Sequence, residues 1–297
     1  MKIVLAGSLG HITRPLAINL IKEGQQVTII SSSPERQKEI EALGAVAAIG
    51  DINDAAFLSN AFSGAEVVYC MVPYPDTKKT FQEVKLTYTG IAENYKTAVL
   101  QTGVKKMVIL SSVGAHMASG NGLLEYAYAI EQAYSMLPED ISIKYMRPVS
   151  FYYNLLSFIP GIKSQGVIAT SYGGDTKKPW VSPIDIATTT AAAILSPFEG
   201  RTFQYIASEM LSCNEIAALI GTAIGKPQLQ WITVPDETVL NTFIKLGMEP
   251  STAQAFTDMN IGIQNGSIYA DYYKHPPELG QVKMADYVKE FARIYQQ

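Results

Sequence analysis

The sequence predicts an α/β protein, with a doubly wound parallel sheet followed by a smaller and mostly helical C-terminal lobe. Short apolar runs alternate with helix-like segments through the first half, which is the order expected for parallel strands joined by crossover helices. After about residue 150 this alternation becomes irregular. We therefore expect a first domain over residues 1–150 and a smaller lobe over residues 151–297, with some later segments returning to the first sheet.

Composition limits the class of protein. Apolar residues make up 47 % of the 297 residues and charged residues 17 %, so a sizeable core is expected. The net charge is −4 with the acidic residues dispersed, which argues against direct binding to nucleic acid. Two cysteines and three widely spaced histidines predict neither a disulfide framework nor a metal site.

The chain carries no sign of secretion or membrane insertion. The opening apolar run is too short for a signal peptide and ends in glycine, and no window approaches the roughly 20 apolar residues of a membrane span. We therefore expect a cytoplasmic protein that does not contact a membrane.

Five strands and four helices are predicted in the first half. The strands are apolar runs at Lys2–Ala6, Gln26–Ile30, Ala45–Ile49, Glu66–Val72 and Lys106–Leu110. The helices are Ile12–Glu23, Pro34–Leu43, Asp54–Phe62 and Lys78–Thr102. Gly24 stands where a helix C-cap belongs, and the uninterrupted apolar character of the fourth strand predicts burial on both faces.

Fewer elements are evident in the second half. A helix is predicted near Leu124–Leu137, and Ser212 with Glu215 forms a capping box that opens another. The other predicted elements are a strand at Ile141–Met146, a loop near Gly173–Lys178, a helix at Pro183–Leu195, a strand at Thr202–Ala207 and an interrupted helical stretch at Val234–Gly262.

A glycine-rich turn follows the first strand and opens the first helix. In that context the pattern Gly7-x-x-Gly10 is typical of a dinucleotide site, because the first glycine permits a tight turn and the second lets a pyrophosphate approach the helix N-terminus. The turn is the predicted pyrophosphate contact, and it comprises Gly7, Ser8, Leu9, Gly10, His11 and Ile12.

The end of the second strand bears on the choice of cofactor. Sites selective for NAD usually carry an acidic residue there, which binds the ribose hydroxyls. Here Ser31, Ser32 and Ser33 are followed by Arg36 and Lys38, and this set suits a 2′-phosphate better than a carboxylate would. Glu35 is the one opposing charge. The segment therefore favours NADP, with NAD as the less favoured alternative.

Further cofactor contacts are expected where other strands end. Asp51 and Ile52 follow the third strand, where such folds meet the adenine, although a simple strand-terminating turn explains them equally well. Met71, Val72 and Pro73 follow the fourth strand, and Ser111 follows the fifth. Ligands of open parallel sheets bind outside these carboxyl ends.

Six short motifs carry a family resemblance over about residues 3 to 190. They are Gly7-x-x-Gly10, Gly50-Asp51, Phe62-x-Gly64-Ala65-Glu66, Leu110-Ser111-Ser112-Val113-Gly114-Ala115, Arg147-Pro148-x-x-Phe151-x-x-Asn154 and Val181-x-Pro183-x-Asp185-Ile186-Ala187. In this order they resemble the NmrA-like group of atypical short-chain dehydrogenases/reductases. Within that group the pattern is most similar to the NADPH-dependent quinone reductases. The resemblance implies a Rossmann fold and an NAD(P) site. It leaves activity open, because the group includes both reductases and catalytically silent NADP sensors.

The usual catalytic set of short-chain reductases is incomplete. Such enzymes use a serine after the fifth strand, matched here by Ser112, and a Tyr-x-x-x-Lys pair in which lysine lowers the tyrosine pKa. No lysine lies four residues after Tyr126 or Tyr128 on the following helix. Ordinary alcohol dehydrogenation is therefore not expected, whereas reduction of a strongly electrophilic acceptor remains open with either tyrosine, or water, as proton donor.

The substrate pocket is expected at the carboxyl ends of the strands. Its candidate residues are Tyr74, His116, Met117, Phe151, Tyr152, Asn154 and Trp180. The same side chains also suit a seam between two lobes, and Arg147 is expected to pair internally. Two functions stay open. One is a reductase of a quinone-like or small carbonyl acceptor, for which a homodimer is a possible state, and the other is a non-catalytic NADP(H) sensor that binds a regulatory protein partner.

Overall fold

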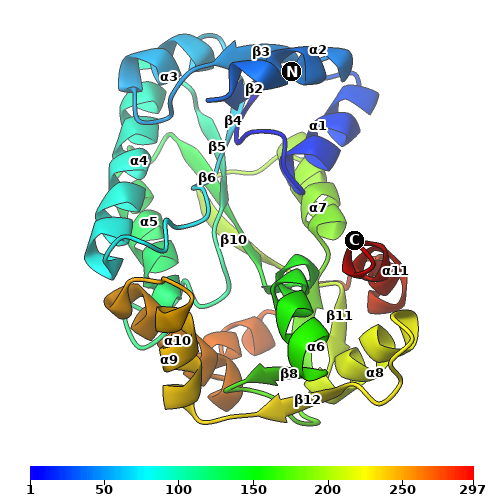
Figure 1. The fold of residues 1–297 in the computed structure, drawn as a ribbon. Coiled ribbons are helices and arrows are strands. Elements are labelled where there is room, and N and C mark those ends of the chain that lie inside the picture. The colour runs from blue at the N-terminus through cyan, green and yellow to red at the C-terminus, as the bar shows by residue number, and fades with distance from the viewer.

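A seven-stranded parallel sheet forms the centre of the computed structural model, which describes all 297 residues (Figure 1). The strand order is β10-β6-β5-β4-β1-β2-β3, and every pairing is parallel. The strands are β1 (Lys2–Ala6), β2 (Gln26–Ser31), β3 (Val46–Ile49), β4 (Val67–Cys70), β5 (Lys106–Leu110), β6 (Ser142–Pro148) and β10 (Arg201–Ile206). The predicted parallel sheet is confirmed, and β10 is a later segment that returns to it.

Helices cover both faces of this sheet (Figure 1). One face carries α3 (Ala55–Phe62), α4 (Phe81–Thr102) and α5 (Glu125–Ser135), and the other carries α1 (Thr13–Lys22), α2 (Gln37–Ala42) and α7 (Pro183–Leu195). The two faces bury separate hydrophobic clusters. Alternate residues of β1 enter different clusters, Ile3 one and Val4 the other, as the pleat of a strand buried on both faces requires.

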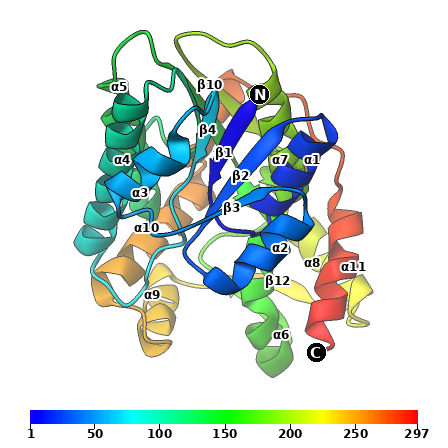
Figure 2. The same cartoon turned by 90° about the horizontal axis from the view of Figure 1, so that it is seen from above.

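The second lobe gathers on the side of the sheet toward which β1 runs from the N-terminus (Figure 2). It is mostly helical, as predicted, and its helices are α6 (Ile159–Gln165), α8 (Cys213–Ala223), α9 (Asp236–Lys245), α10 (Pro250–Asn265) and α11 (Met284–Tyr295). The capping box of Ser212 and Glu215 is present at the start of α8. None of the helices in the structure is both long and apolar enough to cross a membrane.

Two small sheets in this lobe were not predicted. One contains β7 (Ser150–Phe151), β9 (Lys178–Val181) and β11 (Glu209–Leu211), and the other pairs β8 (Val167–Thr170) with β12 (Gln230–Thr233). The division of the chain near residue 150 stays a prediction, because β10 and α7 belong to the large sheet and its covering layer although they follow that position in sequence.

The helix α10 packs directly against a short 3₁₀ turn, η2 (Gly122–Leu124), which precedes α5. At Gly122 the backbone has φ +56°, and an added Cβ atom would lie 2.2 Å from the carbonyl oxygen of Ala255 and 2.4 Å from the amide nitrogen of Met259. These neighbours are backbone atoms of α10 and cannot rotate away. Glycine is therefore required at this position if α10 is to keep its place.

We expect Gly122→Ala to lower the free energy of unfolding by about 2–4 kcal/mol, because it combines a strained φ with overpacking against backbone. Gly120→Ala is the matched control. Gly120 also has a positive φ (+80°), but its added Cβ meets no atom within 4 Å. Urea unfolding of both variants separates the two costs, and equal losses would contradict the packing argument.

Candidate functional site

The glycine turn lies between the carboxyl end of β1 and the start of α1. Gly7 is enclosed, since an added Cβ would stand 2.5 Å from the sulfur of Met71 and 3.0 Å from the hydroxyl of Thr13. Gly10 is open, since its nearest neighbour would be the carbonyl oxygen of Ser8 at 3.8 Å. No side chain caps the N-terminus of α1. The turn thus presents bare backbone and unpaired N–H groups, an arrangement that favours an anion.

Residues after β2 fold back onto this turn. The hydroxyls of Ser31 and Ser8 lie 3.0 Å apart, and Ser31 is buried. The guanidinium of Arg36 donates a hydrogen bond to the carbonyl oxygen of Leu9, within the turn itself. Ser33 donates to the carboxylate of Glu35, and this bond lowers the pKa of Glu35. The predicted cofactor residues of the two segments are therefore brought together, with a cation beside the turn.

The other predicted cofactor residues lie in the glycine turn or in the loops that follow β3 and β4, the strands next to β2 and β1. Asp51 is exposed, and its carboxylate accepts hydrogen bonds from the backbone and side chain of Asn53. Met71 and Val72 are half-buried after β4, and Pro73 is exposed. Leu9 and Ile12 turn their side chains into the core, and His11 is exposed. Ile52 is half-buried after β3.

The two serines after β5 differ in what their hydroxyls bind. Ser111 is buried and donates to the carboxylate of Glu131 at 2.5 Å. Ser112 is half-buried, and its hydroxyl makes no hydrogen bond within the protein. Of the pair, only Ser112 has a hydroxyl free for a ligand.

A buried charge network lies beneath this loop. Arg147 on β6 pairs with Glu131 of α5 through Nε at 3.0 Å and Nη2 at 2.6 Å. Its Nη1 lies 3.3 Å from Asp271 and 3.4 Å from the hydroxyl of Tyr205. Internal pairing of Arg147 is confirmed. The network joins the end of β5, helix α5, β6 and the second lobe, and sequence reasoning did not find Glu131 or Asp271.

Tyr126 and Tyr128 occupy opposite flanks of α5. Side chains two positions apart on a helix point about 200° apart. Tyr126 and Tyr128 therefore lie on either side of the buried face and cannot both reach the same substrate atom. Tyr126 faces α4, where its ring centroid lies 4.9 Å from that of Tyr88, and the hydroxyl of Tyr88 donates to the carbonyl oxygen of Pro73 at 2.9 Å. Tyr126 is thus next to the loop after β4. Burial raises its pKa to about 12, so its phenol stays protonated.

Most predicted pocket residues lie at the carboxyl edge, but two do not reach open space. Tyr74 is exposed, as is Asn154, whereas His116, Met117 and Phe151 are half-buried. Tyr152 and Trp180 are buried, and their assignment to the pocket stays a prediction. Tyr152 bonds internally to Glu209 and to the carbonyl oxygen of Val282. The indole of Trp180 donates to the carbonyl oxygen of Leu211 at 3.2 Å.

His116 is poorly suited to act as a charged acid. Its Nδ1 atom is buried without a hydrogen-bond partner. Burial lowers the pKa of the imidazole, with Asp271 opposing this shift and Arg147 adding to it. The ring is therefore neutral at pH 7.

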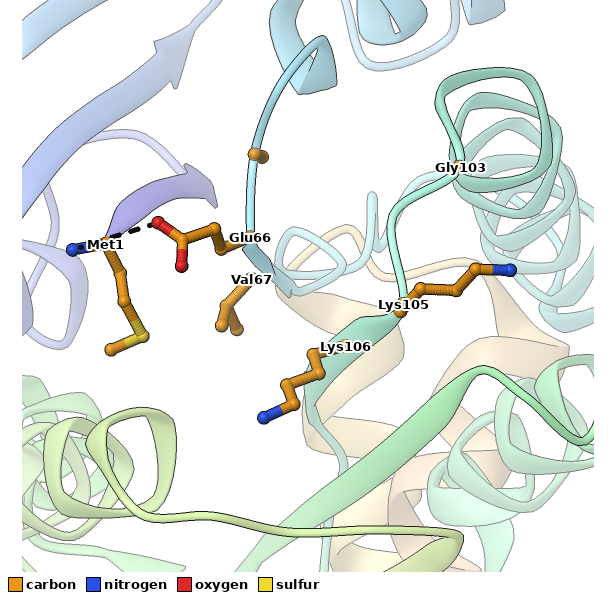
Figure 3. A pocket seen from close by; sticks show the side chains of 7 residues that line it. Met1, Glu66, Val67, Gly103, Lys105 and Lys106 are labelled. Atoms are coloured by element: carbon orange, nitrogen blue, oxygen red, sulfur yellow. Dashed lines mark ion pairs between the residues drawn. The ribbon is translucent and has the colours of Figure 1, made fainter.

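Two cavities lie at opposite edges of the sheet. One of about 350 Å³ adjoins the glycine turn and is lined in part by Gly10, His11, Tyr153 and Tyr287. The rings of His11 and Tyr153 are 3.9 Å apart there, a contact that sequence reasoning missed. The other, of about 250 Å³, lies where β1, β4 and β5 begin, and Met1 pairs with Glu66 beside it (Figure 3). Only the first adjoins the predicted site.

Comparison with known proteins agrees with this geometry. A family model described as the NmrA-like family matches residues 1–269. The chain belongs to the NmrA-like family. The match extends beyond residues 3 to 190, which carried the resemblance, and it leaves α11 outside.

Curated relatives of this NmrA-like chain include two reductases. A (4-alkanoyl-5-oxo-2,5-dihydrofuran-3-yl)methyl phosphate reductase from Streptomyces griseus is 26 % identical over 226 residues, covering 76 % of this chain and 74 % of the relative. An NAD(P)H azoreductase from Xenophilus azovorans is 25 % identical over 230 residues, covering 75 % and 74 %.

Solved structures share the fold along nearly the whole chain. An Escherichia coli NADPH-dependent quinone oxidoreductase, complexed with NADPH, has a TM-score of 0.79 at 19 % identity, covering 98 % of this chain and 99 % of the other. A Citrobacter triphenylmethane reductase, complexed with NADP(H), has a TM-score of 0.76 at 17 % identity, covering 98 % and 100 %. At such identities the likeness establishes the fold alone.

The buried network predicts a large effect on stability. We expect Glu131→Gln to lower the free energy of unfolding by about 3–5 kcal/mol, since it leaves the buried Arg147 guanidinium facing a neutral amide. Lys105→Met is the control, because it removes an exposed ion pair with Asp140 and should leave the unfolding midpoint unchanged. Urea unfolding measures both, and equal midpoints for the two variants would contradict the assignment of this network.

Proposed function

We propose that this NmrA-like protein binds NADPH and reduces a quinone-like or small carbonyl acceptor. The observation that carries the proposal is the open, uncapped glycine turn with the Arg36 guanidinium bonded to it. Relatives named as reductases, and related folds solved with NADPH or NADP(H), support the same function. We further propose that the protein acts in the cytoplasm on a small-molecule substrate.

The residues around the turn fit a phosphorylated dinucleotide. A pyrophosphate fits against Gly10, where a side chain would otherwise project into open space, and against the free N–H groups of α1. A 2′-phosphate fits between Ser32 and Arg36, because guanidinium and hydroxyl donors suit a doubly charged oxyanion. Glu35 keeps its negative charge, because the hydrogen bond from Ser33 lowers its pKa, and it is the one charge in this segment that opposes a 2′-phosphate.

NADPH, when bound, supplies the hydride for the reaction. We assign the role of proton donor to Tyr126, whose phenol is protonated and lies beside the loop after β4. The free hydroxyl of Ser112 donates a hydrogen bond to the acceptor oxygen and so orients the acceptor. Hydride and this proton together add two electrons and two hydrogens to a quinone, giving the hydroquinone, and solvent returns the proton to Tyr126.

The absence of a lysine next to the tyrosine restricts the acceptor. Without a neighbouring cation, Tyr126 is a weaker acid than the tyrosine of a Tyr-x-x-x-Lys pair. Polarisation of an unactivated ketone is then poor. Acceptors that are already strongly electrophilic, such as quinones or conjugated carbonyls, need less assistance and suit this site better.

Cofactor choice is tested by fluorescence titration with NADPH and NADH. We expect NADPH to bind at least tenfold more tightly, and Arg36→Ala to remove that preference by weakening NADPH binding about tenfold or more, the loss typical of a charge-assisted hydrogen bond. Lys245→Ala, which removes an exposed cation on α9, should leave both affinities unchanged. Tighter binding of NADH to the unaltered chain would overturn the assignment.

The proton donor is tested by substitution on both flanks of α5. We expect Tyr126→Phe to lower kcat for quinone reduction at least tenfold, and Tyr128→Phe to change it little. Since the pKa of Tyr126 is about 12, its contribution should not decline as pH rises from 6 to 10. Steady-state NADPH oxidation measures these effects. Tight NADPH binding without turnover of any acceptor would instead favour the NADP(H) sensor.

A further inference from the structure

A row of aromatic residues runs outward from Tyr126. Its next member is Tyr88, whose ring packs on that of Tyr126 and whose hydroxyl donates to the carbonyl oxygen of Pro73, the residue before Tyr74, the third member. The ring of Tyr74 lies 6.4 Å from that of Phe256 on α10, and Phe256 lies 5.9 Å from Phe243 on α9. The row thus links the proposed proton donor to the second lobe.

Tyr74 is the least covered member of this row. Its side chain is 75 % exposed, whereas Tyr88 is only 2 % exposed. Most of the Tyr74 ring is therefore available to a ligand.

Helix α10 is fixed to the loop that carries Tyr74. The backbone amide of Glu249 donates to the carbonyl oxygen of Thr77 at 2.8 Å. The hydroxyl of Thr252 donates to the carbonyl oxygen of Lys79 at 2.7 Å. Gly122 holds the middle of the same helix by backbone contact. The spacing of Tyr74 and Phe256 is consequently set by the fold rather than by flexible side chains alone.

We propose that Tyr74 and Phe256 form a specificity wall for acceptors with two or three fused aromatic rings. The ring that receives hydride lies beside Tyr126, and the further rings stack along Tyr74 and Phe256. This inference rests on the proposed reductase function and adds the size of the acceptor to it. Offset or tilted stacking on aromatic side chains supplies the selectivity, because a single-ring acceptor does not extend far enough to gain it.

Acceptor binding to the protein loaded with NADP⁺, which cannot donate hydride, tests the wall apart from catalysis. Equilibrium dialysis compares 9,10-phenanthrenequinone, with three rings, and tetramethyl-1,4-benzoquinone, with one. The variants are Tyr74→Ala and Phe256→Leu. Leu246→Ala is the matched control, because Leu246 is an exposed apolar residue at the end of α9 outside the row. Thermal unfolding checks that each variant is folded.

We expect Tyr74→Ala and Phe256→Leu each to raise Kd for the three-ring quinone about fivefold, while Kd for the one-ring quinone is unchanged. Leu246→Ala should change neither. Equal losses for both quinones, no loss for either, or no binding of the three-ring quinone by the unaltered chain would overturn the wall. Ring-dependent binding without NADPH oxidation would uphold the wall and reject the reductase.

Discussion

The parallel direction of all seven strands is the constraint on which the rest of this structure depends. Because every strand of the large sheet ends at the same edge, segments far apart in sequence meet there: the glycine turn, the segment after β2, and the loops after β4, β5 and β6. The helices that return along the faces place their N-termini at that edge as well. A site for an anionic, extended ligand follows from topology before any particular side chain is considered.

Sequence patterns predicted this sheet because they report on local burial. Continuous apolar runs, Gly24 as a C-cap and the Ser212 capping box identify elements without knowledge of their partners. The small strands of the second lobe escaped prediction because they are short, and Pro179 interrupts the donor pattern of β9. Helix α11 was overlooked although its buried residues recur at helical spacing, at Met284, Tyr287, Val288 and Phe291.

The sequence placed the candidate site residues by their position relative to strand ends, and it missed the contacts that long-range packing makes. Glu131 and Asp271 reach Arg147 across 16 and 124 residues of sequence, a meeting that no spacing rule encodes. The burial of Trp180 and Tyr152 was not foreseen, because a strand or turn has two faces and sequence did not distinguish the inward one. A shift of one residue along such a segment reverses which face a side chain occupies, so Tyr153 stands open where Tyr152 is enclosed.

The electrostatics of α5 bear on the proposed proton transfer. Oxidation of an alcohol requires a base, and a tyrosine serves as one near neutral pH only when a cation lowers its pKa. In this chain burial instead raises the pKa of Tyr126 to about 12. Arg147, the cation of the buried network, is paired with Glu131 and Asp271. Tyr126 therefore holds a proton to give and has little capacity to accept one. A phenol in that state suits the proposed reduction, in which the acceptor gains oxyanion character as hydride arrives.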